Sequence, residues 1–179
     1  PGGQSTIGYN TSCTLTLGAS GIDMSAATQD FDWQSLLTLG AACTFDVAAS
    51  RTLSIGARDF ALGANTLTVQ GSGLCDISSI VSGTAGLTKS GTGTLRLSGN
   101  NNTLTGTITI WDGELALDQS SNDHAKWGPT ATLRLCGGTL SRTGTAGTVA
   151  QTVASTSLQT RQGKNVITRL AGGGTMIHL

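Results

Sequence analysis

The densest group of residues that could perform acid–base chemistry lies between positions 112 and 127. It combines carboxylates with an imidazole, an ammonium and an indole: Asp112, Glu114, Asp118, Asp123, His124, Lys126 and Trp127. Polysaccharide lyases and hydrolases use paired carboxylates, or carboxylates with calcium and an Arg. A groove lined by Asp112, Glu114, His124 and Trp127 would therefore favour carbohydrate binding or cleavage.

A simpler interpretation competes with catalysis. The carboxylates alternate with apolar residues on one short predicted strand, and no second acidic cluster faces them. The segment 118–130, DQSSNDHAKWGPT, has the composition of a solvated loop that leaves the main body of the protein, where binding residues often lie. We expect no enzyme, and Asp118, Asp123, His124, Lys126 and Trp127 stay candidates for an interaction loop.

Other chemistry is poorly supported. A nucleophile triad needs a histidine, and only His124 and the penultimate His178 exist. Asp123 and His124 are weak candidates for metal ligands, and the cysteine spacings do not suit zinc. We expect no cofactor and no metal.

The four cysteines admit two interpretations. Cys13, Cys43 and Cys75 each lie two residues before an apolar strand residue, so their parity predicts that they point inward. Cys136 has the opposite parity and is expected nearer the surface. Buried free thiols are one interpretation, and disulfides between neighbouring turns of the chain are the other.

The composition limits the class of protein. Charged residues are 11% of the 179, net charge is zero, and no basic stripe exists, so nucleic acid is not an expected partner. Apolar residues are 37% and occur in short alternating runs of Leu, Ile and Val, which argues against disorder. No run is long enough to span a bilayer. Without an initial Met or a signal peptide, the chain is expected to be a mature or excised segment of a longer protein.

The elements that position these residues are short strands built on one repeated unit: a small residue, Thr, an apolar residue, any residue, an apolar residue and a small residue. We predict strands at 13–19, 36–41, 43–49, 51–57, 65–71, 86–91, 93–99, 106–113, 113–118, 131–138, 138–144 and 174–179. At 25–39, where Phe31 and Trp33 alternate with polar residues, we predict a strand rather than a helix.

Apolar residues at one place in this unit recur at a nearly fixed interval. The residues Leu15, Leu37, Leu67, Leu87, Ile108 and Leu133 are mostly about 20 to 25 positions apart. That interval is typical of one turn, or rung, of a β-solenoid, with Gly and Asn at the corners. We expect a corner at 99–102 and place Lys89 and Arg96 on the outer face. The boundaries of the rungs in residues 20–65 stay open.

Residues 81–118 resemble the autotransporter-associated β-strand repeat of passenger proteins. The matching positions are Gly86, Leu87, Thr88, Lys89, Gly91, Gly93, Thr94, Leu95, Leu97, Ser98, Gly99, Asn101, Gly106, Gly113, Leu115 and Leu117. Leu104 stands where the family usually has an aromatic residue, and Thr-Ile-Thr-Ile follows Gly106 in place of a doubled glycine. The resemblance implies an all-β, right-handed, single-stranded parallel β-helix, here a single domain over 1–179. It also implies a secreted or surface-exposed bacterial protein, often adhesin-like, and brings no catalytic residues.

Two further features bear on function. Thr-x-Thr pairs recur, and a regular planar ladder of them would favour ice binding. The chain stops inside a predicted strand, with Thr175, Met176, Ile177, His178 and Leu179, and no cap follows in the sequence. Such an end rung is covered either by the continuation of a longer chain or by the next copy. We expect a structural rod outside the cell: a fibre subunit, a spacer or an adhesin shaft, with a surface glycan or host-cell ligand as a candidate partner and no insertion into a membrane.

Overall fold

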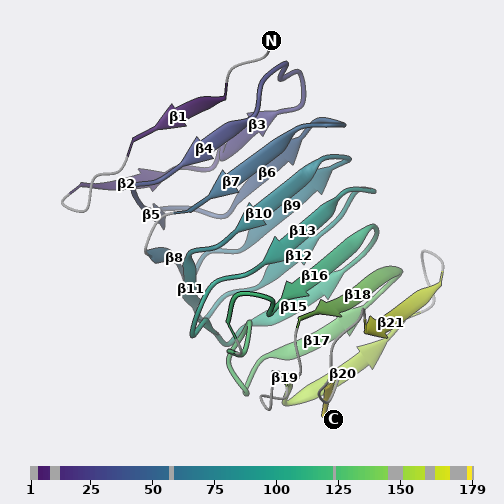
Figure 1. Cartoon of the computed structure of the whole chain (residues 1–179). Helices are drawn as coiled ribbons and strands as arrows, with labels where there is room; N and C mark the ends of the chain where they lie inside the picture. The colour runs from purple at the N-terminus through teal and green to yellow at the C-terminus, as the bar shows by residue number, and fades with distance from the viewer. Residues whose placement is uncertain are drawn as a thin grey trace.

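The computed structural model describes residues 4–8, 13–56, 59–122, 124–144, 151–159, 164–169 and 177–178. In these ranges the chain forms strands and turns and no helix, as Figure 1 shows. Accordingly, these ranges contain no helix of the length and hydropathy that crossing a membrane requires.

Three sheets run along the axis of the molecule. Sheet A consists, in spatial order, of β1 (Ser5–Ile7), β4 (Phe31–Trp33), β7 (Thr52–Ile55), β10 (Leu74–Ile77), β13 (Thr94–Leu97), β16 (Glu114–Asp118), β18 (Gly138–Thr143) and β21 (Asn165–Arg169). Sheet B consists of β2 (Thr14–Leu17), β5 (Leu36–Leu39), β8 (Asp59–Gly63), β11 (Ile80–Gly83) and β14 (Thr103–Leu104). Sheet C consists of β3 (Ile22–Met24), β6 (Cys43–Val47), β9 (Leu67–Gly71), β12 (Leu87–Lys89), β15 (Thr107–Ile110), β17 (Thr132–Leu135) and β20 (Ser155–Leu158). A small fourth sheet pairs β19 (Gln151–Thr152) with β22 (Ile177–His178).

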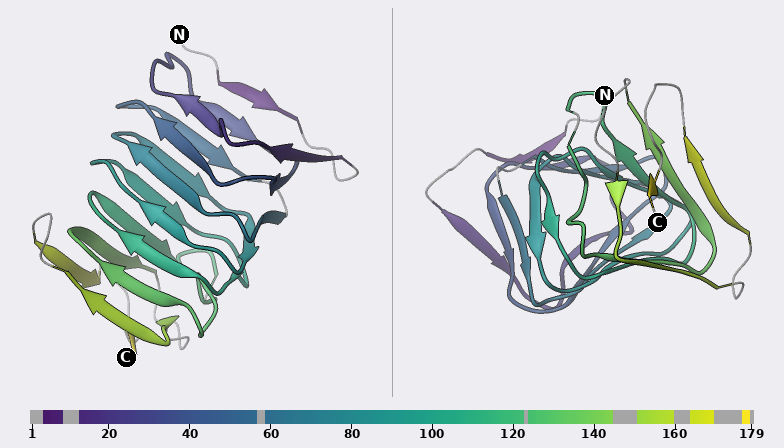
Figure 2. Two further views of the ribbon diagram at one scale, coloured as in Figure 1. Left: turned by 180° about the vertical axis from the view of Figure 1, so that it is seen from behind. Right: turned by 90° about the horizontal axis from the view of Figure 1, so that it is seen from below.

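Each rung passes through sheets A, B and C in turn, and strands of successive rungs pair in parallel. Phe31 lies opposite Leu53 and Leu95 lies opposite Leu115, so one rung takes 22 residues in the first case and 20 in the second. The step lengthens toward the C-terminal end, where Leu140 lies opposite Ile167, 27 residues on. The predicted parallel β-solenoid is confirmed, and Figure 2 shows the strands enclosing its interior when viewed along the axis.

The register explains the one long interval in the sequence repeat. Leu15 lies opposite Leu37 in sheet B, whereas Leu67 lies opposite Leu87 in sheet C. The step from Leu37 to Leu67 is long because it changes sheet within the solenoid, while the rung itself keeps its usual length.

Inward side chains stack in columns that form one continuous core. Every second residue of a strand points inward, and in sheet A these residues follow one another from rung to rung. One column contains Leu53, Cys75, Leu95, Leu115 and Leu140, all at most 1% exposed. Stacking of this kind buries each rung against its neighbours, which is why no rung could fold alone.

Lys89 corrects the expectation of an outward side chain. It has the same parity as Leu87, and its side chain is buried in the inward column of sheet C. The ammonium nitrogen Nζ donates to the carbonyl oxygens of Ser90 at 2.6 Å and Gly91 at 2.7 Å. The stem of Lys89 thus fills the core while its head binds the next corner. Arg96 does lie on the outer face, as predicted, with 41% of its side chain exposed.

Two corners show why the sequence places Gly and Asn there. Gly113 has φ of 66°, and a Cβ on it would lie 2.4 Å from the carbonyl oxygens of Gly91 and Gly93 in the rung below. Only glycine permits that approach. At the predicted corner 99–102, Asn101 has φ of 56°. The buried Asn102 accepts a hydrogen bond at Oδ1 from the backbone N–H of Val81 at 2.9 Å.

Candidate functional site

The segment between β16 and β17 was expected to be a solvated loop, and this expectation is wrong. The segment takes the place of a sheet B strand in its rung. The backbone N–H of Gly128 donates to the carbonyl oxygen of Leu104 at 2.8 Å, as a strand stacked on β14 would do. Lys126 and Trp127 are fully buried. Residues 119–131 therefore form a plug that covers the edge of sheet B, and this name is kept below.

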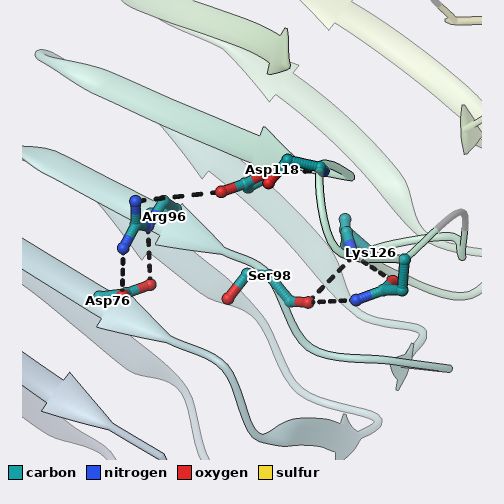
Figure 3. Close-up of polar contacts among 7 residues, drawn as sticks. Asp76, Arg96, Ser98, Asp118 and Lys126 are labelled. Carbon is teal, nitrogen blue, oxygen red and sulfur yellow. Dashed lines mark hydrogen bonds and ion pairs between the residues drawn. The ribbon is translucent and has the colours of Figure 1, made fainter. Parts of the chain in front are cut away.

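Lys126 anchors the plug to the preceding rung. Its Nζ donates to the carbonyl oxygen of Gly99 at 2.9 Å, to the carbonyl oxygen of Ser98 at 3.2 Å and to Oδ1 of Asn122 at 2.7 Å (Figure 3). The backbone carbonyl of Lys126 accepts from Nδ2 of Asn102 at 3.1 Å. Three acceptors surround the ammonium, so its charge serves the corner of the solenoid.

Trp127 and Gln151 anchor the plug to the following rung. Nε1 of Trp127 donates to the carbonyl oxygen of Thr152 at 3.0 Å. The backbone N–H of Lys126 donates to Oε1 of Gln151 at 2.6 Å, and Gln151 is itself 1% exposed. The plug is thus held on both sides by buried hydrogen bonds, which an unmade partner would leave costly.

Asp118 belongs to an ion-pair cluster on the outer face of sheet A. Arg96 forms a bidentate pair with Asp76, and its Nη1 lies 3.9 Å from Oδ2 of Asp118 (Figure 3). Partial burial acts to raise the pKa of Asp118, but hydrogen bonds from Ser120 and the charges of Arg96 and Lys126 outweigh it, so the pKa is lowered. The cluster ties three successive rungs together.

The remaining members of the acid–base group do not gather around one groove. Asp112 and Glu114 lie at the start of β16, and His124 and Trp127 come after its end, so about 16 Å of strand separates the two pairs. Asp112 is exposed and accepts a hydrogen bond from the N–H of Gly113, while Glu114 accepts one from the hydroxyl of Ser141. Trp127 cannot contact a ligand while buried. Asp123 lies outside the described residues.

His124 is half-buried, and its carbonyl oxygen accepts from Nε2 of Gln119 at 2.9 Å. Its ring nitrogen Nδ1 is buried without a hydrogen-bond partner among the described residues. Across the same described ranges, no three His, Cys, Asp or Glu side chains come together as a metal site would require.

Two of the four parity predictions for cysteine are confirmed and two are wrong. Cys43 and Cys75 are buried as expected. Cys13 is exposed, because it precedes β2 in the first rung, which has only one neighbouring rung to cover it. Cys136 is fully buried at the corner that follows β17.

The buried cysteines do not face one another. Cys43 lies opposite Leu67 in sheet C, and Cys75 lies between Leu53 and Leu95 in sheet A. Burial raises the pKa of the Cys75 thiol. The register therefore favours the interpretation of buried thiols for Cys43, Cys75 and Cys136.

The outer face of sheet C is a flank of threonines. One column runs Thr44, Thr68, Thr88 and Thr109 through four successive strands. The parallel column contains Thr107 and Thr132 but is interrupted at Gly86. A shallow hollow of about 510 Å³ follows this flank and ends at Arg134, whose guanidinium lies 5.7 Å from the ring centre of Trp111. A single unbroken column is less than the regular planar array that ice binding requires.

The predicted end interface is described in part. Ile177 and His178 form β22, which pairs in parallel with β19 through Gln151 and Thr152. Thr175, Met176 and Leu179 lie outside the described residues. β22 is the outer member of its sheet, so the strand stands at the C-terminal end of the stack, as Figure 1 shows.

Sequence reasoning missed the plug and the buried roles of Lys89 and Lys126. Parity alone identifies Lys89 as inward, because it alternates with Thr88 in step with Leu87. The lengthened rung is a signal for the plug, since Ile108 lies opposite Leu133, 25 residues on, where the two preceding steps in sheet C take 20 and 21.

Comparison with known proteins gives one match. No curated protein and no solved structure is significantly similar to the chain. Residues 87–117, from β12 through β16, match the passenger-associated-transport-repeat family, whose repeat occurs in autotransporter passengers. That range includes Lys89, the corner at 99–102 and Gly113, which are the positions where the rungs are bound to one another. The chain thus carries a passenger-associated transport repeat within a parallel β-solenoid.

Proposed function

We propose that this chain is a rigid, non-catalytic rod of a secreted or surface-displayed bacterial protein, where it acts as a spacer or adhesin shaft. The passenger-type repeat at 87–117 supports a place outside the cell. The observation that carries the proposal is the unbroken ladder of sheet A, which joins eight strands in one direction. At about 4.8 Å per strand, these span about 34 Å.

The polar residues of the candidate site support the same function. Lys89 and Lys126 donate to backbone carbonyls at corners, and Arg96 bridges carboxylates of neighbouring rungs. Each interaction joins one rung to the next, so the groups that could have done chemistry resist bending and fraying of the rod instead. Cleavage of carbohydrate would need the carboxylates of one groove, and Asp112 and Glu114 lie a strand length from His124.

The experiment compares reach with binding. The chain is displayed on bacteria between an anchor and a labelled tip, and the distance of the tip from the membrane is measured by energy transfer. We expect a narrow distance distribution, against a broad one for a Gly/Ser linker of equal residue number. Deleting residues 74–93 removes one rung and keeps the register, since Thr94 then replaces Leu74 opposite Thr52. This deletion should shorten the reach and preserve folding.

A glycan array probed with the purified chain tests the alternative. The rod function predicts no binding above that of an unrelated β-solenoid. Binding that is lost in Asp112→Asn and Glu114→Gln variants would overturn the non-catalytic rod in favour of a carbohydrate site on the flank.

A further inference from the structure

The charges of the chain are segregated along the axis of the solenoid. Residues 1–50 contain no Lys or Arg and four carboxylates: Asp23, Asp30, Asp32 and Asp46. Residues 124–179 contain no Asp or Glu and six cations: Lys126, Arg134, Arg142, Arg161, Lys164 and Arg169. In a solenoid, sequence position becomes axial position, because each rung stacks on the one before. The rod is therefore acidic toward its N-terminal end and basic toward its C-terminal end, although net charge is zero.

Both ends of the stack present strand edges that pair on one side only. In the described residues, sheet C begins with β3 and ends with β20, and sheet A begins with β1 and ends with β21. Apolar side chains are exposed at the same places. Leu158 of β20 is 64% exposed and Ile167 of β21 is 40% exposed, while Ile7 and Leu15 of the first rung are each 41% exposed. Unpaired edges with exposed apolar residues are surfaces on which further strands can add.

The N-terminal end is also hollowed. A cavity of about 390 Å³ opens beside β3 and β4, and its lining is mostly apolar, with Ile22, Met24 and Phe31. Asp23 and Asp30 stand in the same lining. The cavity has the volume and the apolar walls to receive a large aliphatic side chain.

The inward column of sheet C identifies such a side chain. The column begins at Ile22, passes through Phe45 and Val69 in the N-terminal rungs, and ends at Leu135 and Leu158. A second copy stacked in the same register would continue the column, with Leu158 of one copy against Ile22 of the next. The strands β20 and β3 would then pair as neighbouring rungs do within the chain.

Charge is complementary at one corner of this junction. Asp23 and Asp30 flank the turn that leads from sheet C to sheet A at the N-terminal end. Lys164 is exposed in the segment that leads from sheet C to sheet A at the C-terminal end. Asp30 already pairs with Arg51 at 3.7 Å, whereas Asp23 is exposed. Stacking in register brings the two segments together, with opposite charges.

We propose that the partner of the C-terminal end of this rod is the N-terminal end of a second copy, docked head to tail with Leu158 in the cavity beside Ile22 and Lys164 facing Asp23. The inference rests on the proposed rod function, of which it names the partner. The contact is heterologous and does not close on itself, so it extends into filaments. Rim charges of this kind mainly set the rate and salt dependence of association.

The experiment measures the mass of the 179-residue chain by sedimentation over a concentration series at low and high salt, with electron microscopy of the same samples. We expect end-to-end filaments that shorten as salt rises. Asp23→Lys and Lys164→Glu should each weaken association by about three- to ten-fold. A mixture of the two variants should associate more tightly than either variant alone, because the reversed charges face each other at the mixed junction. Leu158→Asp should also weaken association and leave the fold intact, since that side chain is largely exposed.

Asp59→Lys is the matched control, because it makes the same charge change at an exposed position in the middle of the rod. It should associate as the unaltered chain does. Equal weakening in this control, or association that none of the end variants alters, would overturn the proposal. A chain that stays monomeric at every concentration and salt would overturn it too, while a narrow distance distribution in the display experiment would leave the rod function standing.

Discussion

Lys89 donates from its ammonium to the carbonyl oxygen of Gly91 at 2.7 Å, so a charge that rises from the apolar core closes the corner beyond its own strand. The same nitrogen lies 3.5 Å from the carbonyl oxygen of Asp112, in the corner of the next rung. One side chain therefore binds two successive corners. This arrangement makes the stability of the solenoid depend on the protonation of Lys89.

The first prediction concerns that dependence. Burial lowers the pKa of Lys89 to about 8 from its ordinary 10.5, although the nearby Asp112 carboxylate opposes the shift. Between these two values the unfolded chain holds a proton that the folded chain has released, so unfolding takes up a proton and its free energy rises with pH. Urea unfolding measured from pH 7 to 10.5 should show this rise.

The Lys89→Met variant is the control for that measurement. It keeps an apolar stem of similar length and has no ammonium to titrate. The free energy of unfolding of the variant should lack the part of the rise that Lys89 supplies. If the two proteins gain equally between pH 8 and 10.5, the dependence comes from other groups.

The second prediction compares two glycines that share a positive φ and differ in their surroundings. Gly63 has φ of 60° with no atom within 4 Å of an added Cβ, and Gly113 has φ of 66° with two carbonyl oxygens at 2.4 Å. Gly63→Ala should cost about 1 kcal/mol, the strain of a left-handed conformation alone. Gly113→Ala should cost at least about 3 kcal/mol, because the two rungs must also move apart. Equal costs in urea unfolding would mean that the corner yields freely.

Much of this fold could be predicted from the sequence because a solenoid repeats a local pattern. The alternation in segments such as 93–99 sets which side chains point inward, and the interval between Leu67, Leu87 and Ile108 sets the rung. Strands that carry less regular patterns were missed, among them β8 and β11. Their pairing comes from the neighbouring rungs, which local alternation does not report.

The site was less predictable, because its residues are defined by what stacks above and below them. Lys126 and Trp127 have the composition of a loop, yet they are buried since the chain must cover the edge of β14. Cys13 has an inward parity and is exposed for the opposite reason, because no described strand covers that side of β2. Burial at such positions follows from the number of neighbouring rungs, which a single strand pattern does not contain.

The third prediction concerns the ion pairs on sheet A. Asp118→Asn removes a charge 3.9 Å from Arg96 and should cost about 0.5–1 kcal/mol at pH 7, since much of the pair is exposed to solvent. The pKa of Asp118 is lowered in the fold, so its contribution is present above the ordinary value of 3.8 and is lost as pH falls below it. The difference between variant and parent should therefore vanish near pH 2. A difference that persists there would point to the Ser120 turn instead of the charge.

The fourth prediction tests whether the plug is part of the folded core. Trp127→Ala should lower the free energy of unfolding by about 3–5 kcal/mol, because it empties a fully buried site. Trp127→Phe keeps most of the volume and loses the hydrogen bond to Thr152, so about 1–2 kcal/mol is expected. Trp111→Ala, at a half-buried position beside Arg134, is the comparison and should cost less than Trp127→Ala. Should Trp127→Ala unfold like the parent chain, the segment 119–131 would be a detachable loop, and its residues would return as candidates for binding a ligand.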